Sequence, residues 1–353
     1  MELACTPEQL TADWLSQALQ ASDLLGGARV SAVSQQIIGT GKMGDNLRLT
    51  LEYSRPCAAP ATMIAKLPAA DETARSMAGM MGAYSKEVRF YTELAQHSSM
   101  RTPEIYHAML SDAGTEFILL MEDLAPAEPG DQLQGESLEH ARAALSEAAK
   151  LHAAFQGNKT LLAADFITKS DPDAAAFGQE LLVQNWPGFV ERFGSEVSAE
   201  CLAFGEHYVH RHAQWVASYQ GDTTLIHGDF RAENLLFAGA DKVTTVDWQT
   251  LAESFGLCDV AYLLGGSLEP ALRREHEAAL LEHYRLALAD NGVSLSAEDC
   301  WQQYRLGSMH GIMITVLGAM FSAAEERSDR MFLTMIQRHL QHCVDLSAAE
   351  LIP

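Results

Sequence analysis

The chain has 353 residues, 48% of them hydrophobic, and its 24 Lys and Arg against 47 Asp and Glu give a formal net charge of −23. This length is typical of two domains with a sizeable core, and the acidity disfavours nucleic acid or an anionic membrane surface as a partner. Its cysteines lack a C-x-x-C pair, MELACTPEQL has no basic or apolar leader, and the longest apolar stretch spans only residues 312–321, so we expect a cytoplasmic protein without membrane insertion.

The first informative segment is IIGTGKMGDNLRLTLEY, in which Gly39, Gly41 and Gly44 form a G-x-G-x-x-G pattern. A dinucleotide-binding unit would continue into a helix after these glycines, whereas apolar residues here alternate over 47–53 and predict a strand. Kinases cover nucleotide phosphates with a glycine loop between two strands, and an ordinary glycine hairpin is the alternative. No G-x-x-x-x-G-K-[ST] occurs in the sequence, which disfavours a P-loop enzyme.

Lys66 follows in the short apolar segment MIAKLP, which predicts the next strand. In kinases a lysine at this point meets the α- and β-phosphates and is oriented by a glutamate from a helix. The predicted helix over residues 85–96 offers two glutamates. Glu87 shares its face with apolar residues at i+3, i+4 and i+7, whereas Glu93 shares its face with polar ones. We therefore expect Glu87 to orient Lys66; a surface lysine at a strand end is the alternative.

A further strand is predicted by FILLMEDL, residues 117–124, and the Pro- and Gly-bearing APAEPGDQ predicts a linker after it. We place a nucleotide-binding domain at residues 1–124 and a second domain at residues 125–353. Backbone near Glu122 to Leu124 is expected to contact the adenine, although a buried strand and loop without a ligand would give the same pattern.

The second domain is predicted to be mainly helical, because apolar residues recur at helical spacing over 137–156, 173–220 and 271–346. Gly157 suits the end of the first of these helices. His152, on the same helix, is expected to make a buried structural hydrogen bond rather than to take part in chemistry.

The most specific pattern is H-x-D-x-x-x-x-N, formed by His227, Asp229 and Asn234 in LIHGDFRAENLLF and followed by Asp247 in VTTVDWQ. This spacing is typical of enzymes that transfer the γ-phosphoryl group of ATP to a hydroxyl. One carboxylate must meet the acceptor hydroxyl, and a carboxamide and a second carboxylate must hold Mg²⁺ on the phosphates. Asp229 fits the first role, and Asn234 with Asp247 fits the second. The alternative is that these are ordinary turn residues.

A β-hairpin is predicted between the last two of these residues. Residues 235–237 are apolar, 238–242 contain a glycine, and 243–246 are rich in β-branched residues, which indicates strand, turn and strand. Such a hairpin would bring Asn234 and Asp247 to one edge, as shared metal ligation requires.

Taken together, these motifs resemble the aminoglycoside phosphotransferase and choline kinase-like superfamily, and most of all its ecdysteroid-kinase-like branch with its bacterial relatives. The segments that carry the resemblance lie between about Gly39 and Leu264 and are GTGKMGDN, AKLP, KEVRFYTEL, LLMEDL, GDQLQG, KLHAAF, HGDFRAENLLF, VDWQ and CDVAYLL. The resemblance implies an α+β, protein-kinase-like two-lobed fold, with a small antiparallel-sheet N-lobe and a larger, mainly helical C-lobe. It also implies ATP and Mg²⁺, with Asp229 as base and Asn234 and Asp247 as metal ligands.

Two more residues gain an expected role from the resemblance. Arg231 lies two residues after Asp229, where protein kinases carry a phosphate-contacting lysine, so we expect it at the γ-phosphate. Asp259, in CDVA, is similar to the family aspartate that braces the catalytic loop.

A small-molecule acceptor is favoured over a protein. Asp247 is followed by Trp-Gln instead of Phe-Gly, Asp259 comes only 12 positions later, and no A-P-E follows, which leaves little room for an activation segment. The aromatic-rich segment 186–193 is our candidate wall for a sterol- or terpenoid-like alcohol, and burial in the core is its alternative. Clustered carboxylates near Asp229, such as Glu233, would instead favour an aminoglycoside- or choline-type acceptor.

Two other classes remain open: a pseudokinase that binds nucleotide without transfer, and a metal-dependent hydrolase that uses H-x-D with a distant aspartate. The intact Lys66, Asp229, Asn234 and Asp247 speak against the first. The upstream glycine, lysine and glutamate series, together with the lack of an H-E-x-x-H motif, speaks against the second.

Overall fold

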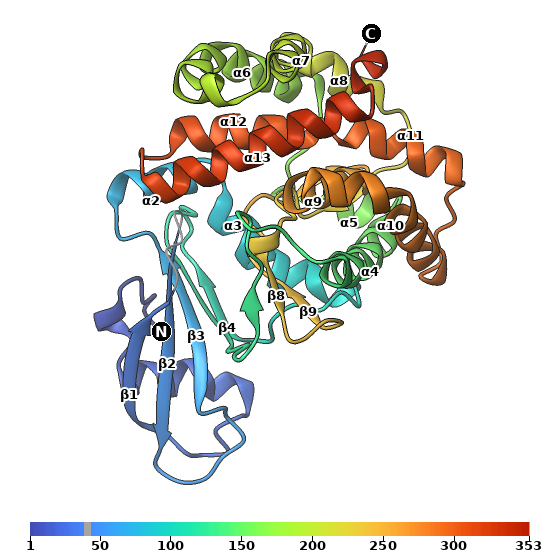
Figure 1. The fold of residues 1–353 in the computed structure, drawn as a ribbon. Coiled ribbons are helices and arrows are strands. Elements are labelled where there is room, and N and C mark those ends of the chain that lie inside the picture. Colours follow the sequence, from blue (N-terminus) through green and yellow to red (C-terminus); the bar gives the residue numbers. More distant parts are fainter. Residues whose placement is uncertain (39–43, 353) are drawn as a thin grey trace. The chain divides into compact units, whose positions relative to one another are not determined.

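The computed structural model describes residues 1–38 and 44–352 (Figure 1). The chain forms two compact units: unit 1 comprises residues 1–96, 102–126 and 247–249, and unit 2 comprises residues 97–101, 127–246 and 250–353. Two glycines of the predicted loop, Gly39 and Gly41, lie outside the described residues.

Unit 1 is built on a five-stranded antiparallel sheet with the strand order β1-β2-β3-β5-β4. The strands are β1 (Val30–Ile37), β2 (Gly44–Tyr53), β3 (Thr62–Pro68), β4 (Ile105–Leu110) and β5 (Phe117–Glu122). The predicted alternation in β2 is confirmed, because Leu47, Leu49 and Leu51 are buried in one core cluster with residues of β3 and β5. Apolar side chains of α1 (Ala12–Ala18) complete this cluster.

A helical segment that lies almost wholly in unit 1 connects β3 and β4 in the sequence. It comprises α2 (Glu72–Met80) and α3 (Ala83–Arg89), and α3 continues through a π-helical turn at Phe90–Leu94 and a short 3₁₀ turn at Ala95–His97. The helix predicted over 85–96 is therefore present, although it starts earlier and widens at its centre. Such π turns are frequently found at functional positions in helices.

Unit 2 is mainly helical, as predicted. Its helices are α4 (Leu138–Phe155), α5 (Lys159–Leu162), α6 (Pro172–Phe193), α7 (Ala199–Val209), α8 (His212–Ser218), α9 (Leu257–Ser267), α10 (Pro270–Asp290), α11 (Ala297–Gly307), α12 (His310–Phe321) and α13 (Glu326–Asp345). Every residue of α9 is buried, which is the pattern of a helix at the centre of a core. Helix α12 packs against α6, α9 and α13, and α13 also packs against α7 and α9.

The short strands of unit 2 form two small sheets. One pairs β7 (Thr224–Ile226) with β10 (Ala252–Ser254), and the other joins β6 (Glu128–Pro129), β8 (Leu235–Phe237) and β9 (Val243–Thr245). The α+β class predicted from the sequence is thus confirmed. In the described part of the chain, no helix is both long enough and apolar enough to span a membrane.

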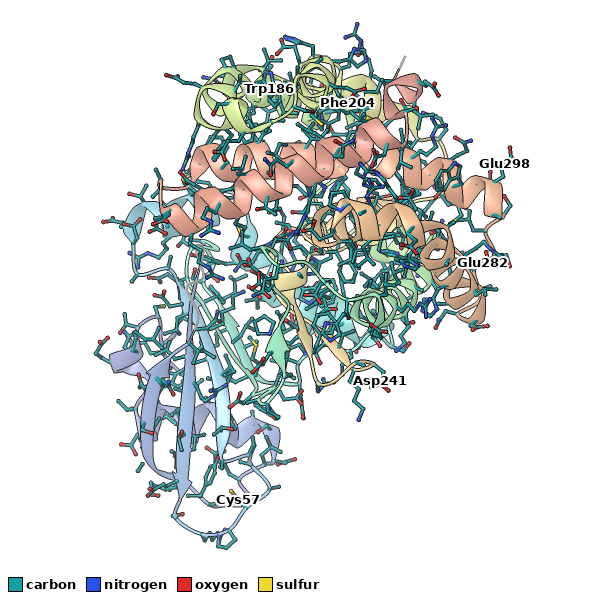
Figure 2. The ribbon with its side chains drawn as sticks, viewed as in Figure 1. Cys57, Trp186, Phe204, Asp241, Glu282 and Glu298 are labelled. Atoms are coloured by element: carbon teal, nitrogen blue, oxygen red, sulfur yellow. The ribbon has the colours of Figure 1, made fainter. Side chains whose placement is uncertain are left out.

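The aromatic residues of α6 form part of the core. Trp186, Phe189 and Phe193 are all nearly inaccessible to solvent. The rings of Trp186 and Phe189 are stacked with centroids 5.7 Å apart, and those of Phe189 and Phe193 are tilted by 44° with centroids 4.9 Å apart. Figure 2 shows Trp186 and Phe204 on the neighbouring helices α6 and α7. The expected acceptor wall at residues 186–193 is therefore wrong, because these rings are occupied by helix packing.

Candidate functional site

Strand β7 leads directly into the loop that carries His227 and Asp229. Gly228 adopts φ +83°, and a Cβ there would lie 2.5 Å from the backbone oxygen of Thr250, so only glycine fits this turn. The ring of His227 is buried, its Nε2 donates to the carbonyl of Val246 at 2.9 Å, and its Nδ1 accepts from the N–H of Asp229 at 3.2 Å. Both ring nitrogens therefore hold backbone in place.

Asp259, near the start of α9, braces the same loop through its backbone N–H groups. Its carboxylate is fully buried and accepts the backbone N–H groups of His227 at 2.7 Å and Gly228 at 3.0 Å. His152 adds a contact at 3.2 Å and is itself bonded to Tyr284 at 2.8 Å, which confirms the buried structural hydrogen bond expected of His152. Burial opposes the charge, but the contacts with His152 and His227 hold the pKa of Asp259 below its ordinary value.

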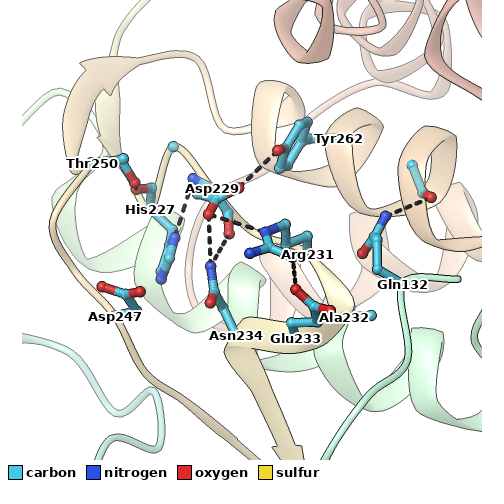
Figure 3. A network of polar contacts seen from close by, with 12 residues as sticks. Gln132, His227, Asp229, Arg231, Ala232, Glu233, Asn234, Asp247, Thr250 and Tyr262 are labelled. Carbon is cyan, nitrogen blue, oxygen red and sulfur yellow. Dashed lines mark hydrogen bonds and ion pairs between the residues drawn. The ribbon is translucent and has the colours of Figure 1, made fainter. Parts of the chain in front are cut away.

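The carboxylate of Asp229 is held by three donors (Figure 3). Tyr262 donates to Oδ1 at 2.7 Å, whereas Nδ2 of Asn234 and Nε of Arg231 donate to Oδ2 at 2.9 and 3.1 Å. Nδ2 of Asn234 also donates to the backbone oxygen of Asp229 at 2.8 Å. The Asp229 side chain is nevertheless 20% exposed, so its orientation is fixed while solvent or a substrate can still reach it.

Arg231 bridges two acidic residues. Besides Asp229, its guanidinium pairs with the carboxylate of Glu233, and it lies 3.8 Å from the sulfur of Met331. Glu233 also pairs with Arg327 at 3.6 Å. The carboxylates of Asp229 and Glu233 are thus matched by two guanidinium groups.

The predicted hairpin is confirmed. Leu235 in β8 is opposite Thr245 in β9, and the turn between them contains Gly239 at φ +88°. The N–H of Val246 donates to the carbonyl of Asn234 at 3.0 Å, and Asp247 is the next residue along the chain. Because Nδ2 of Asn234 is committed to Asp229, the side-chain oxygen is the atom that this residue offers to a cation.

In unit 1, Lys66 in β3 pairs with two carboxylates. Its Nζ lies 2.7 Å from Oε1 of Glu87 and 3.1 Å from Oδ1 of Asp247. The choice of Glu87 over Glu93 is confirmed, because Glu93 instead pairs with Arg89 on the surface. Burial opposes the ammonium charge of Lys66, but Asp247 and Glu87 raise its pKa above the ordinary value, so it stays protonated.

Asp247 has a positive φ of 67° and a side chain that is 41% exposed. A non-glycine residue in this region is strained, and such strain concentrates at functional sites. The next two residues anchor it: Trp248 stacks on Phe90 of the π-helical turn with ring centroids 3.6 Å apart, and Gln249 donates to Oε2 of Glu87 at 2.8 Å. We did not predict Gln249 as a site residue, although its departure from the D-F-G pattern was the available signal.

The other described residues that are predicted to contact the nucleotide lie in unit 1. Gly44 is the first residue of β2, and a Cβ there would lie 2.9 Å from the backbone oxygen of Leu67. Glu122 ends β5, and its carboxylate accepts the N–H of Glu104 at 3.1 Å. Leu124 follows in the linker, and the intervening Asp123 pairs with Arg48 at 2.8 Å. Their roles toward a nucleotide stay predictions.

The donor chemistry of these residues fits Mg²⁺ bound together with phosphates. Within residues 1–38 and 44–352 no cluster of three or more His, Cys, Asp or Glu side chains could hold a metal on its own. Mg²⁺ is bound in such enzymes by one or two protein oxygens, with phosphates and water completing the shell. The Asn234 side-chain oxygen and the Asp247 carboxylate supply oxygens of this type.

Solved structures with a similar fold include phosphotransferases that act on small molecules. Choline kinase from Cryptosporidium parvum Iowa II matches with a TM-score of 0.55 at 10% identity, over 91% of this chain and 92% of that one. Wild-type aminoglycoside 2'-phosphotransferase-IIIa in its GDP complex gives 0.54 at 13% identity, over 92% and 98%. Plasmodium vivax ethanolamine kinase gives 0.53 at 10% identity, over 87% and 81%. At these identities the likeness establishes the kinase-like fold and nothing finer.

No curated protein matches the chain in sequence. A match to a family model identifies the family more specifically than the fold does. The match includes both the segment around Lys66 and the loop around Asp229. The match covers residues 41–296, and the chain therefore belongs to the ecdysteroid kinase-like family.

Proposed function

We propose that this protein is an ATP- and Mg²⁺-dependent O-phosphotransferase that moves the γ-phosphoryl group to a hydroxyl of a small hydrophobic alcohol. The observation that carries the proposal is the carboxylate of Asp229, which three donors orient while it stays partly exposed. Phosphoryl transfer depends mainly on positioning and on charge stabilisation, so an oriented and accessible carboxylate is what the acceptor hydroxyl needs.

Each of the other polar residues has a distinct part in this proposal. Lys66, braced by Glu87, aligns the α- and β-phosphates. Gly44, at the start of β2, is proposed to lie near them, and Gly39 and Gly41 of the same sequence pattern lie outside the described residues. Backbone near Glu122 and Leu124 receives the adenine. Asn234 and Asp247 hold Mg²⁺, which neutralises charge on the phosphates when it is bound. His227 maintains the backbone of the catalytic loop. Arg231, which pairs with Asp229, is proposed to contact the γ-phosphate.

An apolar face of α12 supports a hydrophobic acceptor. His310, Ile314, Leu317 and Phe321 recur at spacings of four, three and four residues, so they lie along one face of the helix, and we name them the α12 stripe. The stripe begins at the catalytic loop, because Nε2 of His310 donates to the carbonyl of Gly228 at 3.0 Å. Ile314 and Leu317 are half-buried and Phe321 is 47% exposed. The stripe extends for about 16 Å, which suits a rigid, largely apolar molecule.

Charge pairing argues against the aminoglycoside- or choline-type alternative. A cationic acceptor would be recognised by carboxylates with unbalanced charge. The two carboxylates at the catalytic loop, Asp229 and Glu233, are already paired with Arg231 and Arg327. A cation would have to displace these arginines, whereas a neutral alcohol would not.

The proposal is tested by transfer of label from γ-labelled ATP with Mg²⁺ into a metabolite extract split into apolar and cationic fractions. Asp229→Asn removes the proton-accepting carboxylate with little change in size, so we expect its turnover to be about 10²- to 10⁴-fold lower with ATP binding retained. Label in the apolar fraction with the wild type alone would support a kinase of hydrophobic alcohols.

The other outcomes discriminate the alternatives. Label in the cationic fraction would replace the hydrophobic acceptor with an amino-sugar or choline-like one. Equal turnover by Asp229→Asn would exclude the role of this residue. ATP binding without label in either fraction would favour a pseudokinase.

A further inference from the structure

Tyr262 contacts the proposed base from helix α9. Its side chain is buried in α9, and its hydroxyl donates to Oδ1 of Asp229 at 2.7 Å (Figure 3). The two residues are 33 positions apart in the sequence, so only the tertiary fold brings them together.

The two oxygens of the Asp229 carboxylate are not equivalent. Each carboxylate oxygen has two lone pairs that can accept hydrogen bonds. Oδ2 accepts from Arg231 at 3.1 Å and from Asn234 at 2.9 Å, so both of its positions are taken. Among the described residues Tyr262 is the single donor to Oδ1, which leaves one position free on that oxygen.

The ring of Tyr262 is fixed from two sides within unit 2. It stacks on His339 of α13, with centroids 4.9 Å apart and planes inclined by 7°. It also meets the ring of His310 edge to face at 5.7 Å, and His310 is bonded to the catalytic loop through Gly228. The hydroxyl of Tyr262 is therefore held at Asp229 by packing that does not depend on Asp229 itself.

The packing around His339 requires two glycines. A Cβ on Gly266 of α9 would come within 2.7 Å of the His339 ring, and one on Gly311 of α12 within 2.5 Å. Three helices thus approach closely enough to clamp this ring under Tyr262. This packing fixes the orientation of the Tyr262 ring and therefore the position of its hydroxyl group.

From this geometry we infer that Tyr262 is a positioning residue that reserves the remaining lone pair of Asp229 Oδ1 for the acceptor hydroxyl; the inference rests on the proposed function. In the transfer step the acceptor O–H bond breaks and its proton goes to Oδ1. The acceptor oxygen forms a bond to the γ-phosphorus, and the bond from that phosphorus to the β–γ bridging oxygen breaks, with the electron pair leaving on the nucleoside diphosphate. Tyr262 keeps its own proton throughout.

The test compares Tyr262→Phe with the wild type in steady-state kinetics on the alcohol fraction that accepts label. Removing the hydroxyl leaves two free positions on Oδ1, so the acceptor and water compete for the carboxylate. We expect kcat for transfer to fall about 10- to 100-fold, as the loss of one hydrogen bond to a charged group predicts. We expect the KM for ATP to stay unchanged, and the share of ATP hydrolysed to inorganic phosphate instead of transferred to rise.

Tyr304→Phe is the matched control. Tyr304 is also fully buried in unit 2 and donates its hydroxyl to a carboxylate, that of Glu277, at 3.2 Å, away from the catalytic loop. Melting temperatures of the two variants show the cost of removing a buried hydroxyl. We expect the two variants to have similar melting temperatures. Only Tyr304→Phe is expected to keep a normal kcat and normal coupling, that is, the normal share of ATP used for transfer rather than hydrolysis.

Three results would overturn the inference, and they distinguish its failure from that of the proposed function. Unchanged kcat and coupling in Tyr262→Phe, or the same kinetic loss in both variants, would reduce Tyr262 to a structural residue while leaving the proposed function intact. Absence of transfer by the wild type on every fraction would remove the proposed function and the inference together.

Discussion

At the scale of single residues, the charges of unit 1 are tightly interdependent. Lys66 lies between the carboxylates of Glu87 and Asp247, and Gln249 takes the second oxygen of Glu87. Glu87 is almost completely buried, so its charge is tolerated only because Lys66 and Gln249 satisfy it. Removal of one charged member of such a group leaves the charge of its partner without a counter-charge.

We predict that Lys66→Met destabilises the protein by about 3–5 kcal/mol, because it leaves a buried carboxylate without its cation. The double variant Lys66→Met/Glu87→Gln removes that charge and is expected to regain most of the stability. Nucleotide affinity should fall at least about 10-fold in both variants, since neither retains a cation for the phosphates. Urea unfolding and calorimetric titration with Mg-ATP measure the two effects.

Lys86→Met serves as the control. Lys86 precedes Glu87 in the same helix, and its Nζ contacts only a backbone oxygen, that of Met81, among the contacts described for it. We expect its nucleotide affinity to be normal. Recovery of nucleotide binding in the double variant would contradict a phosphate-aligning role for Lys66.

At the residue scale, the contact between Lys66 and Glu87 could be predicted because it follows from spacing along the chain. Glu87 was selected correctly because its helix face could be read from the apolar residues beside it. Tyr262 was missed because the residues around it, VAYLL, are mostly apolar and give no indication which side chain meets Asp229. That contact depends on the packing of α9 against the catalytic loop and α13, which no local pattern encodes.

At the scale of elements, the β8–β9 hairpin and α6 show that local structure can be predicted from the sequence, whereas tertiary contacts cannot. The hairpin is a local structure, so its strands and turn were predicted almost to the residue. Helix α6 was predicted from its periodicity, but periodicity does not show whether an aromatic face meets a ligand or another helix. Trp186 and Phe189 are covered within unit 2, whereas the less conspicuous α12 stripe is partly open.

We predict that Leu317→Gln, in the middle of the α12 stripe, raises the KM for a hydrophobic acceptor roughly 10-fold. Burial of a leucine side chain against an apolar ligand contributes about 1.5–3 kcal/mol, and a glutamine would forfeit most of it. The KM for ATP should not change, because the stripe is not proposed to meet the nucleotide. Leu286→Gln, at a leucine of α10 that is 50% exposed, is the control. Equal acceptor KM values for both variants would place the acceptor elsewhere.

At the scale of the whole molecule, unit 2 buries several histidines in their neutral form. Burial lowers the pKa of His212 to about 4 and that of His339 to about 3, and it lowers the pKa of His342 as well. Neither ring nitrogen of His339 or His342 has a hydrogen-bond partner among the described residues. These rings fill space between helices and cannot accept a proton without disrupting the packing.

The stability of the protein should therefore fall as the pH falls from 6.5 toward 4. In the unfolded chain a histidine binds a proton below about pH 6.5, whereas in the folded protein His212 and His339 bind one only near pH 3 to 4, so acid favours the unfolded state. Each such ring costs up to about 1.4 kcal/mol of unfolding free energy per pH unit in this window. His339→Gln removes one contribution, so we expect it to lose about 2 kcal/mol less than the wild type between pH 7 and pH 5 in urea unfolding. Parallel losses in the two proteins would mean that His339 does not titrate on unfolding, and that the acid sensitivity of the fold arises elsewhere.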